Sequence, residues 1–239
     1  MRPIITHFTD DDLYKFTMCC AVIQNYPRTQ VKYHFTDRDN TVYPDGFAEA
    51  LRLQIRMLED LVITDEEIDF MKRRCPYIPS WFYSFLKGYR YDSRCVKIDQ
   101  DKSGRLHIEF EGSWSNTIFL EVKVLAIVSE LYYMMTGEAD SLDYDHYYTV
   151  SRRKAERLVD AGCEFSDFGT RRRASFAAQD TAVRAMSRYQ AENPGPGRFA
   201  GTSNVYLAMK YDLTPIGTMA HELICAIAGM YGPLMANYI

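Results

Sequence analysis

The sequence predicts an α/β protein in which a mixed α/β first part precedes a series of strand–loop–helix units. The second half carries the main signal. Three short apolar stretches alternate there with helical segments over short connections, which is typical of parallel strands. Each stretch runs into a glycine-bearing turn, at Gly169, Gly201 and Gly217. The first half instead combines helical periodicity with the alternating pattern of an antiparallel hairpin.

The composition excludes several classes of protein. The chain has 239 residues, of which 47% are hydrophobic and 25% charged, as is ordinary for a folded protein. Its net charge of −4 argues against a nucleic-acid binder, although residues 151–239 are net positive and favour an anionic ligand. No apolar run approaches the ~20 residues of a membrane span, and the N-terminus lacks the apolar core of a secretory signal.

The six cysteines form no C-x-x-C pair and have no metal-ligand spacing with histidine. We therefore expect them to be reduced, small core residues rather than metal ligands. Reduced thiols without a secretory signal indicate a cytoplasmic protein that makes no membrane contact.

Local patterns place each element of the first half. Thr9 and Asp12 form a T-x-x-D pattern that predicts the start of a helix, and Pro27 predicts its end at Tyr26. Residues 31–36 alternate in hydrophobicity and predict a strand. Further helices are expected over 45–61, over 65–74 with Thr64 and Glu67 as its cap, and over 81–87, followed by a hairpin over 94–112.

A largely apolar segment near 117–136 predicts a long buried helix that ends at Gly137. We place a domain boundary there, with a first domain over 1–137 and a second over 138–239. The second domain then comprises helices over 147–161, 171–190, 204–211 and 220–231. One strand lies between each helix and the next, at 163–169, 198–203 and 215–219.

Loops at the C-terminal ends of parallel strands form ligand sites in α/β proteins. The first such loop, DFGTRRR, places three arginines at a predicted helix start, where the helix dipole disfavours cations. Arg171 and Arg172 are therefore candidates for binding a carboxylate or phosphate, with a solvated surface as the alternative. Phe168 is a candidate for stacking on a flat ring, or else a core side chain.

The second loop, GTSN, offers the hydroxyl groups of Thr202 and Ser203, although a Ser or Asn helix cap is an ordinary alternative. The third loop, GTMAHE, places His221 at the start of an apolar helix. This histidine is a candidate acid, base or nucleophile, or else a structural residue.

Near the N-terminus, the segment DLYKFTM places Tyr14, Lys15 and Thr17 on one face of a helix while Leu13 and Phe16 point inward. An amphipathic surface helix explains this pattern equally well.

Together these segments resemble the nicotinate phosphoribosyltransferases over essentially the whole chain. The matching pieces are, in order, DLYKFTM, the long helix ending in SELYY, EFSDFGTRRR, FAGTSNVYLAMKY and PIGTMAHE. The resemblance implies the type II phosphoribosyltransferase fold, a mixed α/β domain packed on an irregular α/β barrel. It also implies an enzyme that joins nicotinate to 5-phosphoribosyl 1-diphosphate, giving nicotinate mononucleotide and diphosphate in NAD synthesis, coupled to ATP hydrolysis and using Mg²⁺.

The resemblance implies a role for each of five residues. His221 matches a histidine that is transiently phosphorylated, and Phe168 matches an aromatic residue that stacks on the pyridine ring. Tyr14 matches a tyrosine that covers the other ring face from the neighbouring subunit of a homodimer. Arg171 and Ser203 match residues near the ring substituent. The related nicotinamide enzymes have an aspartate at the position of Ser203, so the serine favours the acid over the amide.

The resemblance stops at MANYI, after the third unit, whereas the family continues through units that hold its acidic metal-associated residues and glycine-rich phosphate loops. We therefore expect an incomplete barrel and a partial gene product. Three alternatives stay open: a nicotinamide phosphoribosyltransferase, an inactive fragment that serves only in assembly, and a barrel enzyme that uses His221 as a general base.

Overall fold

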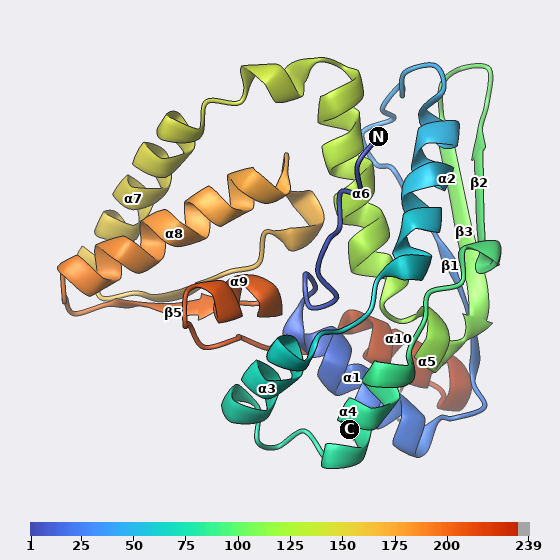
Figure 1. The fold of residues 1–239 in the computed structure, drawn as a ribbon, viewed down its shortest axis with the longest axis horizontal. Helices are drawn as coiled ribbons and strands as arrows, with labels where there is room; N and C mark the ends of the chain where they lie inside the picture. The colour runs from blue at the N-terminus through green and yellow to red at the C-terminus, as the bar shows by residue number, and fades with distance from the viewer. Residues whose placement is uncertain (234–239) are drawn as a thin grey trace.

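The computed structural model describes residues 1–233 as helices around two separate small sheets (Figure 1). The helices are α1 (Leu13–Asn25), α2 (Phe47–Met57), α3 (Asp65–Arg74), α4 (Ser80–Gly88), α5 (Trp114–Thr117), α6 (Leu120–Met135), α7 (Tyr144–Asp160), α8 (Phe176–Glu192), α9 (Val205–Lys210) and α10 (His221–Tyr231). The strands are β1 (Gln30–His34), β2 (Val96–Gln100), β3 (Leu106–Ser113), β4 (Glu164–Asp167) and β5 (Arg198–Thr202). The mixed α/β class predicted from the sequence is confirmed.

The first sheet is antiparallel, with the strand order β1-β3-β2. The predicted hairpin is confirmed, and β2 pairs with β3 so that Ile98 lies opposite Ile108. On the other edge Tyr33 lies opposite Phe110, and their rings stack with centroids 4.5 Å apart. The capping box that begins α3 is also confirmed, with the Glu67 amide donating to the Thr64 hydroxyl over 3.2 Å.

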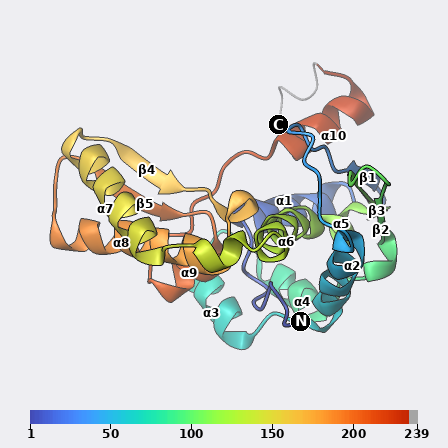
Figure 2. The ribbon, with the colours of Figure 1, turned by 90° about the horizontal axis from the view of Figure 1, so that it is seen from above.

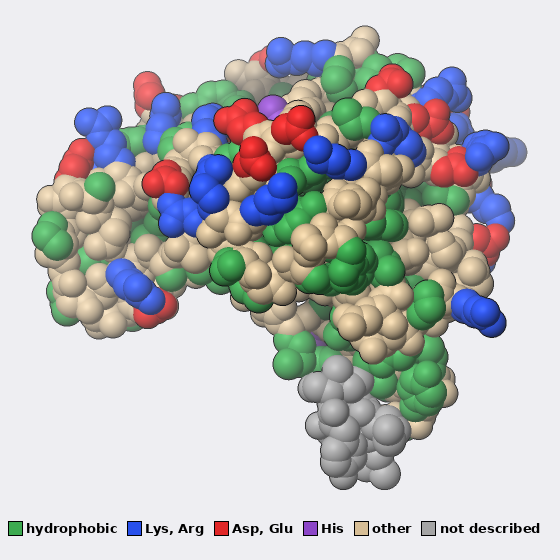
Figure 3. Space-filling view, turned by 60° about the horizontal axis from the view of Figure 1, so that its bottom comes forward, with side chains coloured by type: hydrophobic (Ala, Val, Ile, Leu, Met, Phe, Trp, Pro, Cys, Tyr) green, Lys and Arg blue, Asp and Glu red, His purple; other side chains and the backbone are tan. Residues whose placement is uncertain are grey.

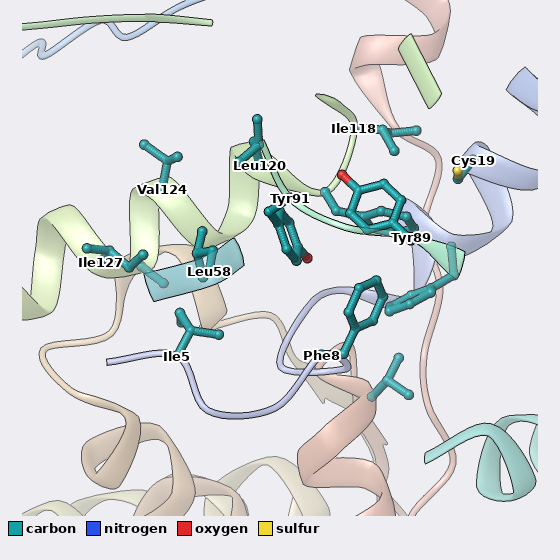
Figure 4. Close-up of a cluster of buried hydrophobic side chains, with 14 of the residues drawn as sticks. Ile5, Phe8, Cys19, Leu58, Tyr89, Tyr91, Ile118, Leu120, Val124 and Ile127 are labelled. Atoms are coloured by element: carbon teal, nitrogen blue, oxygen red, sulfur yellow. The ribbon is translucent and has the colours of Figure 1, made fainter. Parts of the chain in front are cut away.

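Helix α6 is the central element of the larger core. It begins at Leu120, slightly later than predicted, because the short helix α5 precedes it, and it ends before Gly137, whose φ of 78° suits glycine. Figure 4 shows Leu120, Val124 and Ile127 of this helix within the same cluster of buried side chains as Tyr91 and Leu58. Burial of these side chains supplies the main favourable free energy of this half of the molecule.

The second sheet contains β4 and β5, which are parallel as predicted, and helices α7 and α8 pack together beside it. Within residues 1–233 the third predicted strand, over 215–219, does not form. Pro215 makes a single parallel bridge to Thr202, and the Ile216 amide donates to the Thr202 carbonyl over 2.8 Å. The ladder does not continue beyond this bridge, and Gly217, Thr218 and Met219 lie exposed.

This close approach requires a glycine in β5. Gly201 has a φ of 143°, and a Cβ at that position would lie 2.1 Å from the carbonyl oxygen of Thr214. Side chains larger than hydrogen therefore cannot occupy position 201 without moving the bridge. The described residues form the beginning of a parallel sheet and not a closed barrel.

Two predicted helix starts are wrong. Helix α1 begins at Leu13, and Thr9 does not cap it because the Thr9 hydroxyl donates to Glu67 over 2.6 Å. Helix α8 begins at Phe176, after its cap Ser175. The arginines of 171–173 therefore precede α8, and the argument that placed them on its dipole does not hold.

Helix α10 packs on the first half of the chain although it lies in the predicted second domain. Ala220 belongs to the larger core, and Leu223 and Ala226 pack against it. Figure 2 shows α10 beside the first sheet and α1, on the far side of the molecule from α7 and α8. The boundary at residue 137 stays a prediction.

Charges of both signs are interspersed on the molecular face shown in Figure 3. Elsewhere in the described chain, ion pairs at the surface include Arg198 with Glu164 and Lys210 with Asp180. The face shown in Figure 3 therefore does not present the continuous basic stripe typical of nucleic-acid binders.

One buried ion pair joins the two halves of the chain, and a second lies within the first half. The Arg173 guanidinium donates to both carboxylate oxygens of Asp10, over 2.6 and 2.7 Å, and Lys123 donates to Asp11 over 2.7 Å. Burial is the largest single influence and disfavours the charged form of Asp10. The charge and hydrogen bonds of Arg173, together with the hydrogen bond from Asn204, outweigh it, so the pKa of Asp10 is lowered. Burial raises the pKa of Asp11 to about 6 in spite of Lys123.

The Arg173→Met variant tests this link. It leaves the Asp10 carboxylate buried without its cation, which we expect to lower the free energy of unfolding by about 3–5 kcal/mol. Chemical denaturation provides the measurement. The matched control, Arg172→Met, changes an exposed arginine one residue away and should stay within about 0.5 kcal/mol of the unaltered chain. Equal losses in both variants would contradict the role assigned to Arg173.

Candidate active site

A small pocket lies where α1, α6, the loop after β4 and the start of α10 meet. Its volume is about 110 Å³, several times the ~10–15 Å³ needed by one water molecule. The residues that line it are Tyr14, Glu121, Phe168, Arg171, Thr218, Met219, Ala220, His221 and Glu222. Four predicted site residues, Tyr14, Phe168, Arg171 and His221, are thus brought together from three distant parts of the sequence.

Phe168 is an exposed aromatic side chain at this pocket, with 45% of its surface accessible. The carboxylate of Asp167 holds its loop, because it accepts from the Gly169 amide over 3.1 Å, from Gln179 over 2.9 Å and from Thr202 over 2.7 Å. Asp167 thus anchors the loop to β5 and α8, and the next side chain is left at the pocket. An exposed ring in such a place suits stacking on a flat ligand.

Tyr14 lines the pocket of its own chain and is almost fully buried. This differs from the expected contact with a neighbouring subunit, which stays a prediction. Burial, followed by the nearby charges of Asp12 and Glu121, raises the pKa of Tyr14. The phenol is therefore neutral and offers a ring face with a polar edge.

A chain of opposite charges forms one wall of the pocket. Lys15 is completely buried and forms ion pairs with both Glu121 and Glu222, and Arg171 donates to Glu121 over 3.1 Å. Burial opposes charge on Glu121, but Lys15 and then Arg171 outweigh it, so the pKa of Glu121 is lowered. The prediction that Lys15 lies on the surface of the helix is therefore wrong, because its ion pairs with two carboxylates stabilise it in a buried position.

His221 is the first residue of α10 and lies exposed at the edge of the pocket. The residue before it, Ala220, provides no side-chain cap for the helix. The first amide groups of α10 therefore offer hydrogen bonds and a positive partial charge to an anion held near His221.

Three predicted site residues lie outside this pocket. Ser203 and Thr202 are completely buried, and their hydroxyls donate to Asp12 over 2.6 Å and to Asp167 over 2.7 Å. These hydroxyls therefore hold the loop after β4 and the start of α1 in place and do not face the pocket. Arg172 is exposed and lines a different hollow, beside Asp37 and other residues of the segment that follows β1.

Sequence reasoning missed the carboxylates of the pocket. Glu121 lies in a helix that was predicted to be buried, and a charge in such a helix was the available signal. Glu222 follows His221 directly in the GTMAHE motif, but the sequence assigns it no role. In the described part of the chain, residues 1–233, no group of three or more His, Cys, Asp or Glu side chains is placed to hold a metal ion. No helix of that part is long and apolar enough to cross a membrane.

The Lys15→Met variant tests the charge balance of the pocket. Glu121 and Glu222 lose their shared cation in this variant, so protonation of one of the two carboxylates becomes favourable. In the unaltered chain the pKa of Glu121 is lowered in the folded state, so its contribution is present at neutral pH and lost on acidification. In the variant the folded-state pKa of a carboxyl is raised, and the loss of stability shrinks as the pH falls.

Urea denaturation at about pH 7.5 and about pH 5 measures this difference. We expect a loss of about 3–5 kcal/mol at the higher pH and a smaller loss at the lower one. A loss that is independent of pH would show that packing, and not the pairing of charges, explains the burial of Lys15.

Family models, curated relatives and solved structures all match this chain to the nicotinate phosphoribosyltransferases. A family model described as the nicotinate phosphoribosyltransferase N-terminal domain matches residues 9–129, and the nicotinate phosphoribosyltransferase family model matches residues 163–232. A probable nicotinate phosphoribosyltransferase of Schizosaccharomyces pombe is 38% identical over 232 residues, covering 96% of this chain and 56% of that protein. The nicotinate phosphoribosyltransferase of Chromohalobacter salexigens is 38% identical and covers 95% and 57%.

Two crystal structures have the same fold. Nicotinate phosphoribosyltransferase from Porphyromonas gingivalis superposes with a TM-score of 0.90 at 35% identity, covering 98% of this chain and 59% of that one. A putative nicotinate phosphoribosyltransferase from Saccharomyces cerevisiae gives 0.92 at 33% identity, covering 100% and 60%. The chain spans between 56% and 60% of the length of these relatives. Its fold, its order of motifs and these likenesses place it in the nicotinate phosphoribosyltransferase family.

Proposed function

We propose that this chain provides the nicotinate-binding part of a nicotinate phosphoribosyltransferase. The reaction joins nicotinate to 5-phosphoribosyl 1-diphosphate and forms nicotinate mononucleotide and diphosphate in NAD synthesis. The observation that carries the proposal is the pocket in which Phe168, Tyr14, Arg171 and His221 meet. The relatives from Schizosaccharomyces pombe and Chromohalobacter salexigens carry this activity in their names and match 96% and 95% of the chain.

The chemistry of nicotinate fits the side chains at the pocket. Its flat pyridine ring suits the exposed ring of Phe168, with Tyr14 as a second aromatic wall. Its carboxylate suits Arg171, which uses only part of its five-donor fork on Glu121. The positive charges of Lys15 and Arg171 balance the negative charges of Glu121 and Glu222. The net charge of these four groups is therefore close to zero, and they do not repel the carboxylate of nicotinate.

Selection of the acid over nicotinamide rests on Arg171 in this proposal. The hydroxyl of Ser203 donates to Asp12 and is not among the pocket side chains. Its contribution is therefore indirect, through the buried segment that carries Tyr14. A guanidinium attracts a carboxylate much more strongly than it attracts a neutral amide, which makes nicotinamide the weaker ligand.

We further propose that His221 accepts a phosphoryl group from ATP. A phosphorylated histidine at the first residue of α10 places about two negative charges at the positive end of the helix dipole. The uncapped amides of the first turn favour the phosphorylated form. Coupling to ATP hydrolysis is then a transfer from ATP to His221 followed by loss of the phosphoryl group to water.

The expected Mg²⁺ has no matching ligand set within residues 1–233, because no suitable cluster of His, Cys, Asp or Glu side chains occurs there. No step is assigned to it. A homodimer is also proposed. In it Tyr14 covers the pocket of the neighbouring subunit in place of the pocket of its own chain. The six free thiols support a reducing, cytoplasmic location.

The Arg171→Met variant tests nicotinate binding. Loss of the guanidinium should weaken nicotinate binding at least tenfold, about 1.4 kcal/mol, and should leave nicotinamide binding little changed. Isothermal titration of both bases against the chain measures the two affinities. The matched control, Arg172→Met, alters an arginine outside the pocket and should bind nicotinate as the unaltered chain does.

The same titration separates the alternatives. Tighter binding of nicotinamide than of nicotinate would favour the nicotinamide enzyme and contradict the proposal. Absence of binding for both bases would favour an assembly role for the chain.

Phosphorylation of His221 is tested by incubation with ATP labelled on its γ-phosphate. We expect an acid-labile label on the unaltered chain and none on His221→Asn, because asparagine cannot accept the phosphoryl group. His146→Asn, which changes a histidine in the first turn of α7, is the matched control and should keep the label. An enzyme that uses His221 only as a general base would show no label on any of the three proteins.

A further inference from the structure

We propose that Glu222 is a positioning residue that fixes the first turn of α10 so that His221 stays at the pocket. The inference rests on the proposed function for its catalytic meaning, but its structural part stands on contacts of Glu222 alone. Those contacts come from three different elements of the first half of the chain.

The carboxylate of Glu222 accepts hydrogen bonds from three side chains. Trp114 of α5 donates through its indole nitrogen to one oxygen over 2.7 Å, and the hydroxyl of Tyr33 in β1 donates to the same oxygen. Lys15 of α1 donates to the other oxygen. Since a charged acceptor strengthens each of these bonds, the first turn of α10 is tied to α1, β1 and α5 at one point.

Apolar packing covers only part of α10, where Leu223 and Ala226 are partly buried against the larger core. Ile227 is the only residue of this helix that is fully buried, whereas Cys225, Met230 and Tyr231 lie exposed. A helix with so little buried surface depends on its polar attachments to keep one orientation. Glu222 supplies that attachment at the residue directly after His221.

Other roles for Glu222 fit the geometry less well. A general base needs a lone pair facing the substrate, but three of the roughly four lone-pair positions of the Glu222 carboxylate are already used by Tyr33, Trp114 and Lys15. Any acidic residue in the first turn could interact favourably with the helix dipole. That interaction would not require Trp114 and Tyr33 to donate to the same carboxylate. Three donors from different elements converge on Glu222, which indicates that its role is to hold the start of α10 in one position.

Two measurements on the full chain test the attachment without requiring activity. The first is hydrogen exchange of the α10 amides in Glu222→Ala, where we expect exchange at least tenfold faster in α10 and unchanged exchange in α3 and α6. The second is fluorescence in a Trp81→Phe background, which leaves Trp114 as the only tryptophan. There the Glu222→Ala change should shift the emission of Trp114.

Glu222→Gln is the conservative variant and should give intermediate values. Its side-chain oxygen can still accept from Trp114 and Tyr33, while its amide cannot pair with Lys15. The matched control is Cys225→Ala, an exposed change one turn further along α10, which should alter neither measurement. Unchanged α10 exchange and emission in Glu222→Ala would overturn the proposal, as would faster exchange spread over the whole chain.

Labelling by ATP adds the functional readout. In Glu222→Ala the rate of His221 phosphorylation at saturating ATP should fall at least tenfold with little change in the ATP concentration that gives half the maximal rate. Recovery of most of the rate in Glu222→Gln would support positioning. An unchanged rate in Glu222→Ala would overturn it. Absence of label on the unaltered chain would instead contradict the proposed function, and the exchange and fluorescence results would still decide the role of Glu222.

Discussion

The burial of three consecutive aspartates, Asp10, Asp11 and Asp12, is the constraint on which the rest of the structure depends. A carboxylate removed from water must be paired or hydrogen-bonded, or it destabilises the fold by several kcal/mol. Each aspartate meets this requirement with a different partner: Arg173, Lys123 and the Ser203 hydroxyl. These partners come from the loop after β4, from α6 and from the turn after β5, so the aspartates join both halves of the molecule at one place.

The candidate active site follows directly from that junction. The aspartate segment runs into α1, whose first residues contact the turn after β5 through Leu13, and α6 and α10 through Lys15. The Leu13 amide donates to the Ser203 carbonyl over 2.8 Å, so the start of α1 is held against the turn after β5. Tyr14 then reaches the pocket, while Lys15 pairs with Glu121 and Glu222. Pocket shape and pocket charge are therefore set by groups that also hold the fold together.

Local patterns in the sequence predicted most elements well. The capping box at Thr64, the hairpin and the glycine after α6 depend on neighbours in the chain, and all three are confirmed. The start of α1 and the strand over 215–219 were predicted wrongly for the opposite reason. Thr9 finds a better partner in Glu67, which is distant in sequence, and a strand requires a neighbour that offers more than one bridge.

The sequence by itself determined the family, the order of the motifs and four residues of the pocket, because short segments with unusual composition keep their chemical meaning without their surroundings. Only the tertiary structure decided which side chains of those motifs face the pocket. Of three adjacent arginines, Arg171 lines the pocket, Arg172 lies outside it and Arg173 is buried on Asp10. Residues distant in sequence determine this difference. The buried carboxylate of Asp10 pairs with Arg173, and the other two arginines stay accessible to solvent or ligand.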